Sequence, residues 1–211
     1  MLKDKDIREP LFEFLEENYK KIRIFEEKNI GRSRADIIMI QNSLIYGIEI
    51  KSDADTYVRL KSQIEDYDKF FDYNIIVVGS SHAYHVKEHI PKHWGIIVTE
   101  NIDDKTDFYI LREPEINETA NIYNQLSFLW RPEIAHIQEI NGLYKYAGKS
   151  KEFVINYLFE SVEKEKLKRQ ITDELFERDY TKIFDEINKY SEEKKQNARR
   201  RKKYKRRKKS V

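Results

Sequence analysis

The chain has 211 residues and no cysteine, and 37% of its residues are charged. The absence of cysteine excludes a disulfide scaffold, a zinc site built from thiolates and a cysteine nucleophile. The length allows one substantial hydrophobic core with a smaller helical addition. No apolar run approaches membrane-spanning length and the first residues carry no apolar signal region, so we expect a cytoplasmic protein with no membrane partner.

The net charge of +2 conceals an uneven distribution of charge along the chain. Twelve of the 40 Lys and Arg residues and none of the 38 acids lie in residues 194–211, which leaves 28 bases against 38 acids elsewhere. Like charges repel one another, so we expect the last dozen residues of this basic tail to be disordered or to form a helix extension that frays. We expect it to bind nucleic acid through phosphate contacts, and its densest run is Arg199, Arg200, Arg201, Lys202 and Lys203. The alternatives are a solubility tail and docking onto the acidic surface of the protein itself.

The first elements predicted in chain order are a helix over residues 4–18 and a strand over residues 21–27. Residues 34–40 and 44–51 follow, both rich in Ile, Leu, Met and Tyr and separated by a short polar break. This pattern predicts two antiparallel strands of a hairpin, and the nearly continuous apolar runs indicate the centre of a sheet.

The register of this hairpin brings three charged side chains together. If Asn42 and Ser43 are the two turn residues, the ladder places Asp36 opposite Glu49. Side chains alternate between faces with a period of two, so Lys51 shares the face of Glu49 and Asp36. Directly opposed residues are ~5 Å apart, and like charges at that distance are destabilising. Two facing carboxylates beside a lysine are therefore better explained by a metal site.

Mg²⁺ is the expected ion, with Mn²⁺ as a substitute, because Mg²⁺ binds through one or two carboxylates together with phosphate oxygens. Asp36 and Glu49 supply the carboxylates, and the backbone carbonyl of Ile50 can add a third oxygen. Lys51 then lies within reach of an attacking water or a phosphate oxygen, where it stabilises charge or helps to deprotonate the water. The alternative is that Asp36 and Glu49 simply end strands at the solvent edge.

A helix predicted over residues 57–71 carries the next candidates. Its apolar stripe faces the sheet, and Gln63 lies at the edge of that stripe with Arg59 one turn before and Tyr67 one turn after. We expect Gln63 to join the catalytic group and Arg59 and Tyr67 to contact nucleic acid. Alternatively, Tyr67 belongs to the core and the other two are ordinary flanking polar residues.

The rest of the chain predicts further strands and then helices. Two buried strands are expected over residues 73–79 and 95–99, and an edge strand is expected over residues 107–112. A short helix is expected between the two buried strands, from residue 80 to a point before Pro91. These elements predict an α/β fold with a mixed central sheet flanked by helices. Helices follow over residues 121–130, 132–140, 151–161 and 164–190. We therefore predict a core over 1–112, a helical lobe over 113–193 and a basic tail over 194–211.

These motifs resemble the PD-(D/E)XK nuclease superfamily, in a small, sparsely characterised bacterial branch. The resemblance rests on Arg-Ala-Asp36, then Glu49-Ile50-Lys51, then Gln63-x-x-x-Tyr67. It covers roughly residues 20 to 100 and, more weakly, residues 125 to 180. It implies a restriction-endonuclease-like core, metal-binding acids at Asp36 and Glu49, and a catalytic lysine at Lys51. Ala35 stands where the motif name has proline. An acid from an earlier element often completes such sites, and the candidates are Glu27, as the first choice, Glu26 and Glu13.

The sequence thus predicts a Mg²⁺-dependent nuclease, a metal-dependent phosphodiesterase that acts on DNA in preference to RNA. One alternative is a nucleic-acid-binding module without useful turnover. Another is an effector subunit of a larger defence or mobile-element system, in which the C-terminal helices dock a protein partner. A homodimer is compatible with double-strand cutting.

Overall fold

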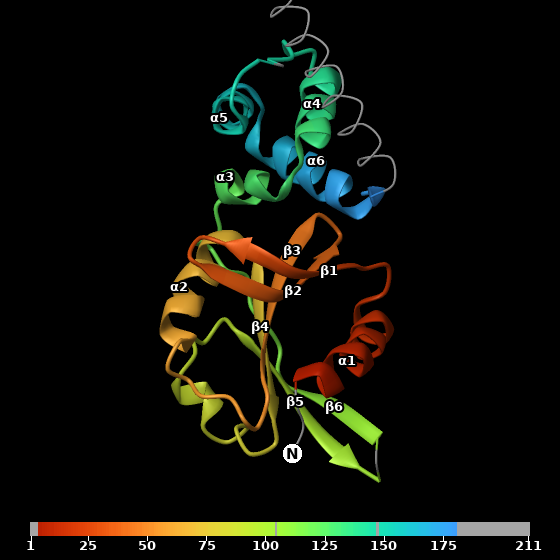
Figure 1. Cartoon of the computed structure of the whole chain (residues 1–211), viewed down its shortest axis with the longest axis vertical. Coiled ribbons are helices and arrows are strands. Elements are labelled where there is room, and N and C mark those ends of the chain that lie inside the picture. The colour runs from red at the N-terminus through yellow and green to blue at the C-terminus, as the bar shows by residue number, and fades with distance from the viewer. Residues whose placement is uncertain (1–3, 104, 147, 181–211) are drawn as a thin grey trace, which may run out of the picture.

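The centre of the molecule is a six-stranded mixed sheet in the order β1-β2-β3-β4-β5-β6 (Figure 1). A computed structural model describes residues 4–103, 105–146 and 148–180. Strands β1 to β3 are antiparallel, β3 to β5 are parallel, and β6 is antiparallel to β5. The strands are β1 (Arg23–Ile30), β2 (Ser33–Gln41), β3 (Leu44–Lys51), β4 (Tyr73–Gly79), β5 (Gly95–Ile102) and β6 (Lys105–Arg112). The predicted α/β class with a mixed sheet and an edge strand is confirmed.

The two faces of this sheet are covered by different helices. Helix α1 (Asp4–Tyr19) packs on one face through Ile7, Leu11 and Leu15, and α2 (Leu60–Phe70) packs on the other. Figure 1 shows α1 and α2 on opposite sides of the strands. Burial on both faces explains why the central strands read as continuous apolar runs.

The β2–β3 hairpin has the predicted two-residue turn. Asn42 and Ser43 have φ values of 47° and 66°, and Gln41 pairs with Leu44. Two positive φ values are typical of the tight turns that match the twist of the strands. The register continues to Ile37 opposite Ile48, which leaves Asp36 facing Glu49 at the next step along the ladder.

The hairpin and α2 approach each other closely at two places. A Cβ on Gly47 of β3 would lie 2.1 Å from Cδ2 of Phe71, so only glycine allows this contact. At the β1–β2 turn, the buried Asp66 of α2 accepts hydrogen bonds from the Arg32 N–H (3.1 Å) and the Ser33 hydroxyl (2.7 Å). These contacts bring the polar edge of α2 to the β1–β2 turn.

Two of the helices predicted between residues 57 and 90 differ from the structure. Helix α2 begins at Leu60, so Arg59 precedes it. Residues 80–90 form turns and a single 3₁₀ turn, η1 (Val86–Glu88), in place of the expected helix. Tertiary contacts explain the second difference: the Ser81 hydroxyl donates to the Asp53 carboxylate, and the rings of His82 and His89 pack against Tyr57. Such contacts override weak helix propensity.

The chain continues into a group of helices, the first of which packs against α2. They are α3 (Ile122–Gln125), the 3₁₀ turn η2 (Leu126–Phe128), α4 (Arg131–Ile140), α5 (Lys151–Ser161) and α6 (Lys164–Phe176). The Asn117 amide donates to the carbonyls of Asp68 and Phe71, and the Gln125 amide donates to that of Phe70. These bonds satisfy orphan carbonyls at the C-terminus of α2. Helix α6, which was predicted over residues 164–190, ends at Phe176. Residues 181–190 of the predicted range lie outside the described residues.

The described residues contain no helix that is both long enough and apolar enough to cross a membrane. The division into three segments at 112 and 193 remains a prediction.

Candidate functional site

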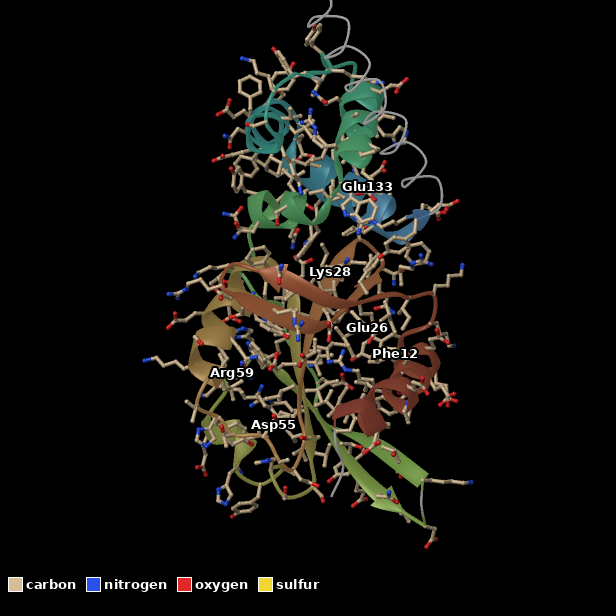
Figure 2. The ribbon with its side chains drawn as sticks, in the orientation of Figure 1. Phe12, Glu26, Lys28, Asp55, Arg59 and Glu133 are labelled. Carbon is tan, nitrogen blue, oxygen red and sulfur yellow. The ribbon has the colours of Figure 1, made fainter. Side chains whose placement is uncertain are left out.

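A cavity of about 560 Å³ lies where the hairpin ends beside α2. Arg59 and Asp55 are on its wall, on the side of the sheet opposite Phe12 of α1 (Figure 2). The predicted residues in its lining are Glu27, Asp36, Glu49, Ile50, Lys51, Arg59 and Gln63. The structure therefore brings together side chains from β1, β2, β3 and the start of α2.

Glu49 is the most buried acid of this cavity, with 1% of its surface exposed. Its Oε1 accepts hydrogen bonds from the Lys51 ammonium and the Gln63 amide, and its Oε2 accepts one from the Tyr67 hydroxyl at 2.6 Å. An ionised carboxylate has about four acceptor positions. Three donors therefore orient Glu49 and still leave an oxygen lone pair for a further ligand.

Asp36 faces Glu49 from β2, and its carboxylate is contacted by a backbone N–H group and by an arginine side chain. Its Oδ2 accepts a hydrogen bond from the Ile50 N–H at 2.9 Å, and the Arg8 guanidinium lies 3.6 Å from Oδ1. Burial, and then the negative charge of Glu49, raise the pKa of Asp36 to about 7; the Ile50 N–H, Lys51 and Arg8 oppose this shift only partly. Two facing carboxylates thus share a site in which a further cation would favour ionisation of both.

Tyr67 of α2 forms hydrogen bonds with both acidic residues, through the Glu49 carboxylate and the Asp36 backbone. It is fully buried, its ring packs against Phe71 and Trp94, and its hydroxyl also accepts a hydrogen bond from the Asp36 N–H at 3.3 Å. Burial, followed by the charges of Glu49 and Asp36, raises the pKa of Tyr67 well above its usual value, so it is a neutral donor. The expectation that Tyr67 contacts nucleic acid is wrong, because a buried ring is inaccessible to a polyanion; the alternative assignment to the core was right.

Gln63 and Ile50 place further oxygens at the cavity. The carbonyl oxygen of the Gln63 side chain is buried and has no hydrogen-bond partner among the described residues. The N–H and C=O of one strand residue point toward the same neighbouring strand, so the Ile50 carbonyl is directed to the side where its N–H meets Asp36. Arg59 is exposed on the rim, where a solvent-borne ligand can reach it.

A third acid is not grouped with Asp36 and Glu49. Glu27 lines the cavity, but it is exposed and pairs with Arg34 at 3.2 Å, while Glu26 pairs with Arg8 at 3.3 Å. Glu13 lies exposed on α1. Within the part of the chain that the structure describes, no three His, Asp or Glu side chains are close enough together to hold a metal ion. Glu27 has a φ of 52°, and this irregularity in β1 turns its side chain in a way that strand alternation does not predict.

Arg8 is the site residue that sequence reasoning missed. It comes from α1, lines the cavity and contacts Asp36 across 28 positions of the sequence. The residue next to it, Ile7, is fully buried, and helix periodicity indicates only that Arg8 flanks an apolar stripe. Arg199 to Lys203 lie outside the described residues.

The fold and this cavity define a mixed-sheet α/β protein with a carboxylate–lysine cluster at the end of its central hairpin. A sequence model of the family described as Bacteriophage P4 protein cII matches residues 1–202. The chain therefore belongs to the bacteriophage P4 protein cII family. The matched family is not named as a PD-(D/E)XK nuclease, so that resemblance remains a prediction.

One curated relative and one solved structure illustrate what the chain is similar to. Protein cII of Enterobacteria phage P4 is 23% identical over 149 residues, which cover 68% of this chain and 55% of the relative. The chain thus spans about half the length of that relative. Among solved structures, SfsA of Pyrococcus furiosus in complex with Ca²⁺ has 14% identity and a TM-score of 0.31, over 56% of this chain and 62% of the other. A TM-score this low carries no argument about fold or function.

Proposed function

We propose that this protein is a divalent-metal-dependent nuclease that hydrolyses phosphodiester bonds, with DNA as the favoured substrate and Mg²⁺ as the ion. The observation that carries the proposal is the convergence of Asp36, Glu49 and Lys51 on one solvent-accessible cavity, with Gln63 on the same Glu49 oxygen as the lysine.

The residues of the cavity fit a hard cation. Asp36 and Glu49 offer carboxylate oxygens, and burial, followed by the charge of Glu49, raises the pKa of Asp36 despite the nearby Lys51 and Arg8. A further cation at this place would stabilise the ionised pair. Mg²⁺ typically takes one or two protein carboxylates and completes its shell with water and phosphate oxygens, so a third acid is not required. The Ile50 carbonyl is a further oxygen at the same place.

The roles of the side chains follow from their contacts. A divalent ion held by the two acids supplies Lewis acidity toward a phosphate oxygen and makes water more acidic. Lys51 has three donors, so its ammonium can keep Glu49 and still stabilise negative charge on a non-bridging oxygen. The unpaired Gln63 oxygen can accept a hydrogen bond from the attacking water. Tyr67 and Arg8 are positioning residues that hold Glu49 and Asp36.

The test is cleavage of plasmid, linear duplex, single-stranded DNA and RNA in Mg²⁺, in Mn²⁺ and in EDTA. Glu49→Gln and Lys51→Ala should lower the rate by at least about 100-fold, the usual contribution of a catalytic group. Lys61→Ala, an exposed lysine on α2, is the matched control and should cleave normally. Absence of cleavage of all four substrates in both metals would contradict the proposal.

A nucleic-acid-binding module without turnover is the second candidate, and the ion pairs Lys51–Glu49 and Arg8–Asp36 favour it. In that case the cations already balance the acids and no ion is needed. Salt-dependent binding that Glu49→Gln leaves unchanged, together with no cleavage, would identify this function. Each phosphate neutralised contributes ~0.7–0.9 to the salt slope, and we propose that residues 194–211 supply most of those contacts.

The relatives bear on biological context, since the family and the 23%-identical protein are both named for bacteriophage P4. This supports the proposal of a role in a mobile-element system, with a partner or a second copy docked on the C-terminal helices. Size-exclusion chromatography with light scattering distinguishes a monomer from a homodimer.

A further inference from the structure

A second cavity, of about 180 Å³, separates β1 from the C-terminal helices and is rich in cations. Its lining includes Lys28 from β1, Lys151 from α5 and Arg178 from the segment after α6. Figure 2 shows Lys28 on the side of the sheet that faces these helices and Glu133 on the helix opposite. Three positive side chains from distant parts of the chain therefore meet in one partly enclosed space.

The acid nearest to this group is already engaged. Arg178 is only 4% exposed, and its Nε and Nη2 donate to the two oxygens of Glu133 at 2.6 and 2.8 Å. The guanidinium also lies 5.2 Å from the ring centres of both Phe25 and Trp130. Arg178 is therefore a buried structural cation, and Glu133 balances its charge.

The two lysines have no such partner. Lys28 forms no ion pair with any described residue, and the Lys151 ammonium donates to a neutral carbonyl, that of Ser127, at 2.7 Å. Burial first, and then the charge of Arg178, lower the pKa of Lys28. Burial lowers the pKa of Lys151 as well, with Arg178 and Arg131 adding to the effect against the opposition of Glu133.

We propose that this cavity binds a phosphate group, held between the ammonium groups of Lys28 and Lys151. A phosphate monoester carries about 1.5–2 negative charges near neutral pH, which complements two lysines that form no ion pair with a described acid. The volume equals that of about six waters at roughly 30 Å³ each, so the group fits with part of its hydration. Lys151 is the first residue of α5, where helix polarity disfavours a cation and favours an anion. The phosphate is either the free ion or the terminal group of a nucleotide.

Isothermal titration calorimetry of the full chain with inorganic phosphate tests the site. Lys28→Met and Lys151→Met keep the aliphatic stem and remove the charge, and each should weaken binding roughly 10- to 100-fold, the value of one charge-assisted hydrogen bond. Lys92→Met, an exposed lysine in the turn before β5, is the matched control and should bind as the wild type does. Lys28→Met relieves repulsion between cations without loss of an ion pair, so its thermal midpoint without phosphate should not fall. Lys151→Met also loses the hydrogen bond to the Ser127 carbonyl, so its binding is measured below its own thermal midpoint, which separates lost binding from lost folding.

Further titrations identify the source of the phosphate. A 5′-phosphorylated deoxynucleotide that binds through Lys28, while its unphosphorylated nucleoside does not, assigns the site to a nucleotide terminus; binding of inorganic phosphate alone assigns it to the free ion. Equal binding of acetate, no binding of phosphate at millimolar concentration, or binding that both lysine variants leave intact would overturn the proposal. The measurement is of binding and not cleavage, so its outcome is independent of nuclease activity.

Discussion

Removal of the Tyr67 hydroxyl isolates the contact that holds the two acids together. In Tyr67→Phe the ring and its packing against Phe71 and Trp94 remain, while Glu49 loses a donor at 2.6 Å and the Asp36 N–H loses its acceptor at 3.3 Å. A hydrogen bond to a charged group contributes about 1.5–3 kcal/mol to stability. In a chain of this length, that loss lowers the thermal midpoint by about 3–12 °C.

The assay is urea unfolding followed by circular dichroism, analysed for the free energy of unfolding and its denaturant slope. Tyr123→Phe is the matched control: Tyr123 is half-buried, and its hydroxyl forms no hydrogen bond with the residues that the structure describes. We expect that variant to remain within about 0.5 kcal/mol of the wild type.

A double-mutant cycle with Glu49→Gln then tests the charge on the acceptor. With a neutral amide in place of the carboxylate, the same hydroxyl is worth only about 0.5–1.5 kcal/mol, so the two substitutions should be non-additive by about 1 kcal/mol or more. A Tyr67→Phe effect no larger than that of Tyr123→Phe, or strict additivity with Glu49→Gln, would refute the proposed support of the site by Tyr67.

Three further predictions concern other parts of the fold. Gly47→Ala should destabilise the protein by about 1–3 kcal/mol or more in urea unfolding, because the new Cβ meets the buried Phe71 ring. Arg178→Met should cost about 3–5 kcal/mol, since it leaves the Glu133 carboxylate buried without its cation; a smaller loss in the double variant with Glu133→Gln would confirm that the pair acts as a unit. The raised pKa of Asp36 means that the folded state holds a proton that the unfolded state releases between pH 4 and pH 7, so stability falls as pH rises through that window. Asp36→Asn should remove that fall, which amounts to about 3 kcal/mol between pH 4.5 and pH 7.5, in unfolding curves recorded without metal at these two pH values.

Each of these has an outcome that contradicts it. Gly148→Ala is the control for Gly47→Ala, because a Cβ there meets nothing within 4 Å, and equal effects of the two would argue against a clash. Unchanged stability in Arg178→Met would mean that the guanidinium does not balance Glu133 in solution. A pH profile of Asp36→Asn parallel to that of the wild type would assign the titration to other groups.

Much of the fold was predictable from local pattern. A two-residue turn and a side-chain period of two specify every pair in a hairpin, so Asn42 and Ser43 were enough to place Asp36 opposite Glu49. Helix periodicity likewise put Gln63 and Tyr67 on the sheet-facing side of α2. These relations span few residues and depend only on backbone geometry.

The same patterns did not predict contacts between elements that are distant in the sequence. Arg8 reaches Asp36 only because α1 packs across the sheet, and Glu27 turns away to Arg34 because β1 is irregular at that residue. Periodicity identified the apolar stripe of α2 but not the depth at which Tyr67 lies.

The sequence by itself therefore determined the mixed α/β class, the hairpin register and the facing pair Asp36 and Glu49 with Lys51 beside them. Only the tertiary structure decided that Arg8 meets Asp36, and that Lys28, Lys151 and Arg178 line a second cavity. The reason is physical: local pairing follows from backbone repeats, whereas contacts between different helices and strands follow from how complete elements pack, and no short-range repeat encodes that packing.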